Sequence, residues 1–175
     1  METPINKLTP RKTKDFNWRL LHGLVNTEKK LKAMKLSDGL CKMCNRGVVE
    51  DINHLLYDCQ NAKELWGIME QIVTTWLNEP FIIQEIQALT GVWNNEYMNV
   101  DNKILIINTL LSICRHHIWR RRCSIKYGNE QINQTQNKKL LKWRIIEHLD
   151  LLIQSNTMSS SAMSGELKEI IFQIF

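Results

Sequence analysis

The chain lacks any apolar run long enough to cross a membrane. Its 175 residues contain no stretch of about 18 consecutive apolar residues, which is the length that a spanning helix requires. Residues 1–14 are polar and basic, so they do not resemble the apolar centre of a secretory signal. Only three prolines interrupt the chain, and hydrophobic residues make up 43% of it, which is enough for one packed core. We therefore expect no membrane partner.

Cysteine is also scarce, and its number is odd. Five cysteines cannot all pair in disulfides, and nothing in the sequence suggests secretion. A Cys-x-x-Cys motif can serve redox chemistry, but the β-α-β pattern that usually surrounds it is missing here. We expect an intracellular protein, in the nucleus or the cytoplasm, where thiols stay reduced.

Four ligand-type residues fall within a short segment with the spacing C-x2-C-x9-H-x4-C. They are Cys41, Cys44, His54 and Cys59. Three thiolates and one imidazole complete a closed tetrahedral zinc site, and zinc would hold together a segment too short to bury its own core. Gly47 can supply the positive φ that a tight turn after Cys44 often needs. The sequence predicts one structural Zn²⁺. A catalytic zinc would need an open coordination position and a base, for which only Glu50 is near. Buried free cysteines are the remaining alternative.

Apolar residues recur at three- and four-residue steps along most of the remaining chain, which predicts a mainly α fold. The zinc segment would form a small embedded CCHC knuckle or hairpin within it. We expect helices that begin at Asp15 and after a cap at Asn26 or Thr27, and further helices over 62–77, 81–89, 101–127, 137–154 and 166–175.

The same pattern suggests three parts. Residues 1–14 are expected to form a flexible basic arm, and residues 15–127 a helical domain that carries the zinc knuckle. Residues 128–175 would add C-terminal helices, separated by a Ser-rich linker at 155–165.

Positive charge is concentrated in two blocks. Residues 1–36 carry nine Lys or Arg against three acids, and residues 101–127 carry six against one, whereas residues 60–100 carry one Lys against five Glu. Such asymmetry is typical of proteins that bind polyanions. Solvated helix faces that happen to be basic are the alternative.

The second basic block predicts a nucleic-acid-binding surface on one helix. The candidate contacts are Arg115, Trp119, Arg120, Arg121, Arg122 and Lys126, with Lys42 and Arg46 on the zinc turn as a second contact. The cations would neutralise phosphates, and Trp119 would offer a ring for stacking. On this interpretation, changing Arg115, Arg120 and Arg122 to Gln leaves thermal stability nearly unchanged. The alternative is a solvated helix end.

The same helix also carries Cys114, His116, His117 and Cys123. They point to different sides of a continuous helix, so a second metal site is not expected. We expect one buried cysteine and two exposed histidines instead.

Several of these features together resemble the zinc-finger-like region near the C-terminus of reverse transcriptases from non-LTR (LINE-type) retrotransposons. The residues that carry the resemblance are Trp18-Arg19-Leu20-Leu21-His22-Gly23, Cys41, Cys44, Glu50, His54-Leu55-Leu56, Cys59, Ala62, Leu65-Trp66 and Ile118-Trp119-Arg120-Arg121-Arg122. It covers about residues 15 to 127. Gln60 and Asp51 depart from the family pattern, which often has proline and threonine there.

The resemblance implies a nucleic-acid-binding accessory module that follows a polymerase. The aspartate pair of the polymerase itself is absent, so we expect no polymerase or endonuclease activity and no enzyme of another kind. The expected partners are RNA or DNA and an upstream reverse transcriptase domain. A helical domain that docks on a polymerase without touching nucleic acid is the alternative, and a small zinc hydrolase is a weaker one.

Overall fold

The fold was analysed in a computed structural model, which describes residues 9–91, 102–128, 131, 133–154 and 158–174. The mainly helical fold expected from the sequence is confirmed. The helices are α1 (Arg11–Leu21), α2 (Glu28–Ala33), the π-helical turn η2 (His54–Asp58), α3 (Gln60–Leu77), α4 (Glu85–Thr90), α5 (Asn102–Gly128), α6 (Gln134–Gln154) and α7 (Met158–Ile174). Across the described ranges, β pairing is limited to one antiparallel bridge between Leu40 and Val49, so the knuckle is a bridged loop.

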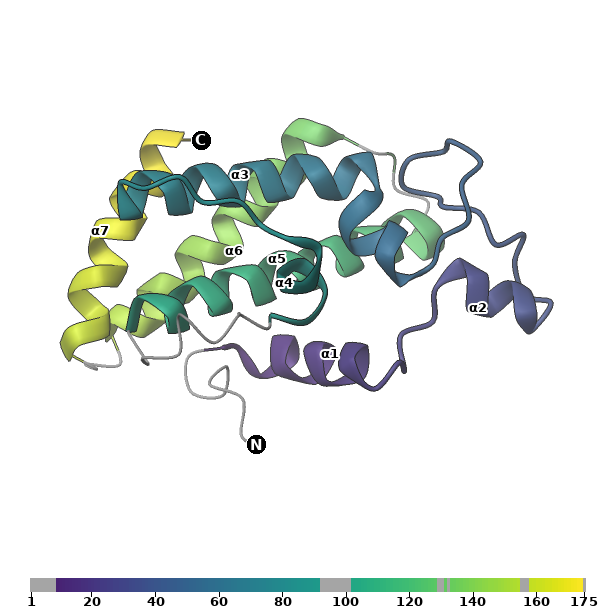
Figure 1. Ribbon diagram of the computed structural model, residues 1–175, viewed down its shortest axis with the longest axis horizontal. Coiled ribbons are helices and arrows are strands. Elements are labelled where there is room, and N and C mark those ends of the chain that lie inside the picture. Colours follow the sequence, from purple (N-terminus) through teal and green to yellow (C-terminus); the bar gives the residue numbers. More distant parts are fainter. Residues whose placement is uncertain (1–8, 92–101, 129–130, 132, 155–157, 175) are drawn as a thin grey trace.

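Helix α5 runs through the middle of the molecule. It contacts α1, α3, α4, α6, α7 and η2, and α1 and α3 lie on opposite sides of it (Figure 1). Because neighbours surround α5, every residue from Ile106 to Arg115 is buried, so the first half of the helix is enclosed on all sides. A helix enclosed in this way buries more than the single apolar stripe of a surface helix.

Helix α3 follows the expected period closely and links the zinc segment to the core. Its buried positions include Ala62, Leu65, Trp66, Met69, Ile72, Val73 and Trp76. The Trp66 indole N–H donates to the Leu56 carbonyl oxygen at 2.6 Å, which ties the start of α3 to η2.

Helices α1 and α4 each begin four residues away from the start that the sequence predicts. Helix α1 begins at Arg11, so the expected basic arm becomes helical before it ends, and Thr13 and Phe16 are buried. The reason is that Pro10 occupies the N-cap position, where its fixed φ suits a helix start. Helix α4 begins only at Glu85, because Gln84 and Gln87 form a capping box there.

The prediction of a Ser-rich linker at 155–165 is wrong for most of these residues. Helix α7 begins at Met158, while residues 155–157 lie outside the described residues. No glycine or proline occurs between 158 and 164, and further along α7 the side chains of Leu167 and Ile171 are buried in the common core. Packing against α6 and α3 therefore outweighs the modest helix propensity of serine.

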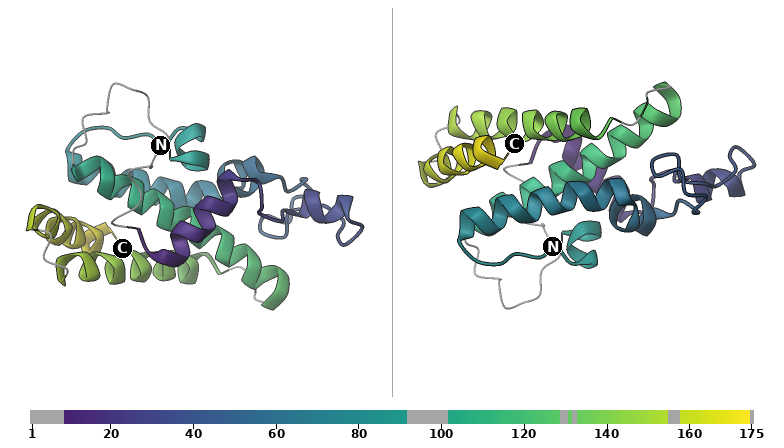
Figure 2. Two further views of the ribbon diagram at one scale, coloured as in Figure 1. Left: turned by 90° about the horizontal axis from the view of Figure 1, so that it is seen from below. Right: turned by 90° about the horizontal axis from the view of Figure 1, so that it is seen from above.

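The long helices form one body with the zinc segment at its edge. Both views of Figure 2 show α6 and α7 at one end and α2 with the zinc segment at the other. A continuous core joins residues from α1, α3, α5, α6 and α7. Within the described ranges, none of the helices combines the length and the apolar composition that a membrane crossing requires.

Candidate functional site: a zinc centre and a basic groove

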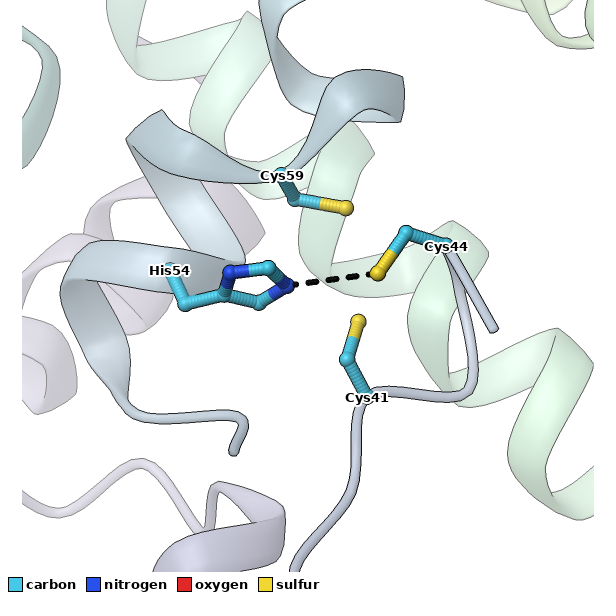
Figure 3. Close-up of side chains that lie close together, drawn as sticks. All are labelled: Cys41, Cys44, His54 and Cys59. Atoms are coloured by element: carbon cyan, nitrogen blue, oxygen red, sulfur yellow. Dashed lines mark hydrogen bonds between the residues drawn. The ribbon is translucent and has the colours of Figure 1, made fainter. Parts of the chain in front are cut away.

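The four predicted zinc ligands come together. The sulfur atoms of the three cysteines and a ring nitrogen of His54 all lie within 4.8 Å of one another (Figure 3). Cys44 Sγ and His54 Nε2 are 3.5 Å apart. The buried Cys41 and Cys59 form the inner side of the cluster, and Cys44 and His54 are half-buried. All five cysteines of the chain are free thiols.

A tight turn places the first two sulfurs. Asn45 and Gly47 adopt positive φ values of 50° and 71°, which turns the chain back after Cys44. The Cys41 N–H donates to the Val48 carbonyl at 2.8 Å and so closes the loop. The positive φ expected at Gly47 is confirmed, and a side chain there would strain the backbone.

The π-helical turn places the other two ligands. The Cys59 N–H donates to the His54 carbonyl at 2.8 Å, a hydrogen bond that spans five residues. In an α-helix residues i and i+4 share a face, whereas the wider π turn brings residue i+5 back over residue i. The carboxylate of Asp51 accepts the His54 N–H at 3.0 Å and fixes the start of this turn. His54 and Cys59 consequently face the same point in space.

The three cysteines of the cluster differ in how readily they lose their proton. A hydrogen bond between Cys41 and Cys59 raises the pKa of Cys41 and lowers the pKa of Cys59. Burial raises the pKa of Cys44. Backbone N–H groups at the start of α3 point to the Cys59 sulfur and stabilise its thiolate.

The donor set fits one zinc ion. Bonds of about 2.3 Å to sulfur and about 2.0 Å to nitrogen place tetrahedral ligands roughly 3.5–3.8 Å apart, which is compatible with the observed cluster. Four protein donors leave no coordination position for water or substrate, which is the arrangement of structural zinc. One structural Zn²⁺ is the cofactor that this centre takes. Across the described ranges, no second group of three or more potential ligands comes together.

Glu50, the only candidate base near the zinc segment, is instead an ion-pair partner of Arg122. Its carboxylate contacts Arg122 Nη2 at 2.9 Å and Nε at 3.0 Å, and both side chains are fully buried. The same oxygen accepts the N–H of Glu28 at 3.0 Å. The Glu28 carboxylate in turn contacts Arg122 and Lys126, each at 2.5 Å. This cluster, the buried ion network, joins α2, the zinc segment and α5.

Charge compensation holds the buried ion network together. Burial alone would raise the pKa of Glu28, but the hydrogen bonds from Lys126 and Ser37 and the charge of Arg122 lower it below its usual value. Burial opposes the charge on Arg122 as well, yet the nearby Glu50 and Glu28 raise the pKa of Arg122. The four charges therefore depend on one another.

The prediction of a basic surface on α5 is wrong for most of its residues, because their side chains are buried. Arg122 is 0% exposed, Arg115 is 1% exposed and Arg121 is 6% exposed, so these three side chains do not present their charge to solvent. Arg115 donates to the Gln87 carbonyl at 3.2 Å and to Ser112 Oγ at 2.9 Å. Lys126 is held by Glu28 in the buried ion network. Helix α5 is enclosed on several sides, so cations along it point inward as well as outward.

The other predicted contacts lie in different places. Arg120 is exposed, as expected. Trp119 is half-buried, with its ring centroid 6.0 Å from that of Phe16 and 5.1 Å from the Arg122 guanidinium, so its ring already has partners. On the zinc turn Arg46 is exposed, while Lys42 is paired with Asp38 at 2.5 Å.

The two adjacent histidines of α5 are not exposed, contrary to expectation. His117 is fully buried, and its Nε2–H donates to Asn137 Oδ1 at 2.7 Å. His116 is half-buried, 3.0 Å from Thr13 Oγ1, and stacks on Phe16. Burial lowers the pKa of His117 to about 3 and that of His116 to about 4, so both are neutral at pH 7.

Three adjoining hollows between α1, α5 and α6 share Lys12 and His116, and we call them together the basic groove. Figure 2 (left) shows α1 lying over α5 with α6 beside it. The charged residues that line it are Arg11, Lys12, Arg19, Arg120 and Arg144, together with Asp15 and Glu147. The sequence interpretation included only Arg120 of these. The basic N-terminal block was visible in the sequence, but the packing of α1 on α5 was not.

These features define a helical domain with a closed zinc centre of three cysteines and one histidine. Comparison with known proteins agrees, since residues 3–66 match the family described as zinc-binding in reverse transcriptase. Over 74 residues the chain is 28% identical to the transposon TX1 uncharacterized 149 kDa protein of Xenopus laevis. That match covers 42% of this chain and 6% of the relative. No solved structure matches. The resemblance to retrotransposon reverse transcriptases is thus confirmed.

Proposed function

We propose that this chain is a nucleic-acid-binding accessory module of a retrotransposon reverse transcriptase and has no polymerase or endonuclease activity of its own. The zinc centre serves as a structural clamp. The basic groove carries the binding, in place of the outward α5 surface expected from the sequence. The observation that supports this proposal is the charge of the groove, which has five cations against two carboxylates.

The charges of the groove are poorly compensated within the protein. Burial, together with the positive charges of Arg120 and Arg121, lowers the pKa of Arg144 to about 10. Of the two carboxylates, Asp15 is already paired with Arg19 at 3.0 Å. An anion placed between Lys12, Arg120 and Arg144 would relieve this repulsion, and phosphates are the anions that such clusters bind.

The comparisons favour a role within a larger protein. The chain spans only 6% of the length of its transposon relative, whose printed name describes a 149 kDa protein. We infer that an upstream reverse transcriptase domain is the second partner. Five free thiols suit a reducing compartment, in the nucleus or the cytoplasm.

A titration at two salt concentrations tests the proposal. Fluorescence anisotropy of the full chain with labelled single-stranded RNA and duplex DNA should show binding that weakens steeply as salt rises. Changing the exposed Lys12 and Arg120 to Gln should weaken binding and flatten the slope of log K against log salt. Each lost phosphate contact should reduce that slope by about 0.7 for a single strand and about 0.9 for a duplex.

The matched control is Lys63→Gln on α3, which also removes one exposed cation but does not line the basic groove. We expect this variant to keep the affinity and the salt slope apart from a small general charge effect. If the control weakens binding as much as Lys12→Gln does alone, the groove is not the binding site.

Docking on a polymerase without nucleic-acid contact is the second candidate function. Large apolar side chains are exposed toward the end of α1 and after α2, among them Trp18, Leu21, Leu24, Met34 and Leu36. Exposed apolar residues in such numbers suit a protein contact. A chain that binds neither RNA nor DNA at low salt would favour this candidate.

A further inference from the structure

One large aromatic side chain of the basic groove has no obvious use in holding the fold. Trp143 on α6 is 58% exposed and lines the same hollow as Lys12, Arg120 and Arg144. Within the part of the chain that the structure describes, no ring or cation contact to Trp143 is found. Its indole face is therefore available to a ligand in this hollow.

The other tryptophan of the groove differs in this respect. Trp119 stacks on Phe16 with an angle of 22° between the rings, and the Arg122 guanidinium lies 5.1 Å from its centroid. A ring with these partners supports the wall of the groove. The Trp119 ring is therefore less open to a ligand than the Trp143 ring.

The combination of an available ring with nearby cations discriminates between forms of nucleic acid. In a duplex both faces of each base are covered by its neighbours, and only base edges and phosphates reach the surface. In a single strand the base faces are open, and proteins hold such strands in basic grooves with aromatic side chains that stack on the bases. An exposed indole face beside several cations suits the second form.

We propose that the basic groove binds single-stranded nucleic acid, with one base stacked on Trp143 and the adjacent phosphates held by Lys12 and Arg120. This inference rests on the proposed function and specifies its ligand. RNA and DNA share the chemistry involved, since every base has a face that can stack. Glu147, the remaining carboxylate of this hollow, disfavours phosphate on its own side and so helps to set the path of the strand.

Anisotropy titrations of the full chain with labelled U12, dT12 and a blunt-ended duplex of mixed sequence test this proposal. We expect the two single strands to bind more tightly than the duplex. Trp143→Ala should weaken single-strand binding by roughly 5- to 140-fold, which is the usual loss for one stacked base. It should leave the salt slope unchanged because no phosphate contact is lost. Trp143→Phe should recover much of the affinity.

Leu151→Ala is the matched control, because Leu151 is an exposed apolar residue of the same hollow and cannot stack on a base. It should bind like the unmodified chain. Thermal melting of each variant should be unchanged, since both side chains are largely exposed. Duplex binding should be insensitive to Trp143→Ala.

The outcomes separate this inference from the proposed function. Absence of binding to all three probes at low salt would overturn the proposed function and the inference together. Salt-dependent binding in which Trp143→Ala retains full single-strand affinity would overturn the inference alone. Equal loss for single strands and duplex would also overturn it, because a stacked base requires an open strand.

Discussion

The loss of Arg122 should destabilise the protein strongly, although Arg122 belongs to a run of three arginines. In Arg122→Gln the carboxylates of Glu28 and Glu50 stay in a fully buried place without their shared cation. Lys126 still reaches Glu28, but Glu50 keeps no cationic partner among the contacts described here. Removing one partner of a buried ion pair costs about 3–5 kcal/mol. For a chain of this size that corresponds to a fall in Tm of roughly 6–20 °C.

Circular dichroism melting of the zinc-loaded protein measures this effect, and Arg120→Gln is the matched control. Arg120 lies two residues away and undergoes the same change of charge, but it is exposed. We expect its Tm to stay within about 2 °C, because exposed charges contribute little to stability. The sequence interpretation expected both substitutions to be harmless, and the structure separates them.

A third variant checks the cause. Replacing Glu28 and Glu50 by Gln together with Arg122→Met removes the buried charges at once, and such replacements are often nearly neutral. It should recover a large part of the lost Tm. The reasoning is refuted if Arg122→Gln melts like the unmodified protein, or if the triple variant is no more stable than Arg122→Gln alone.

Two further predictions concern zinc and pH. Metal analysis of the purified chain should find one zinc per molecule. The Cys59→Ser variant should lose this zinc and expose Trp66, which a red shift of the tryptophan emission would report. A zinc-free protein of native stability would contradict this prediction. His117, with a folded pKa of about 3 against 6.5 in the free side chain, binds its proton mainly when unfolded. Stability should therefore be full above pH 6.5 and fall as the pH drops toward 4, by about 1.4 kcal/mol per pH unit for this residue. His117→Gln should flatten that fall in urea titrations, and an unchanged pH profile would show that His117 is not buried as a neutral base.

The zinc centre was predictable because its information is local. Cys41 and Cys59 lie close in sequence, and the turn between Cys44 and Gly47 needs only the backbone freedom of those residues. The ligand spacing reveals the site without any knowledge of the remaining fold. Helices such as α3 were predictable for a similar reason, since their apolar residues recur at helical spacing within one continuous segment.

The buried arginines were not predicted because their partners are distant in sequence. Arg122 is 72 residues from Glu50 and 94 from Glu28, and no local pattern joins them. A periodic signal was nonetheless present. Leu111, Arg115, Ile118, Arg122 and Ile125 follow one another at steps of four and three, so both arginines lie on the apolar stripe of α5. A cation on such a stripe requires a buried partner, and this points to its burial rather than to a solvent surface.

The buried ion network also connects the two parts of the candidate site. Glu50 lies between Val49, which pairs with Leu40 at the base of the zinc loop, and Asp51, whose carboxylate holds the N–H of His54. Its own carboxylate fixes Arg122 on α5. A rotation of α5 about its axis would break these contacts, and it would also turn Arg120 away from the groove. The ion pair between Glu50 and Arg122 therefore fixes which side of α5 faces α1. In this way a closed metal centre without chemistry of its own can determine where the exposed cations of the groove lie.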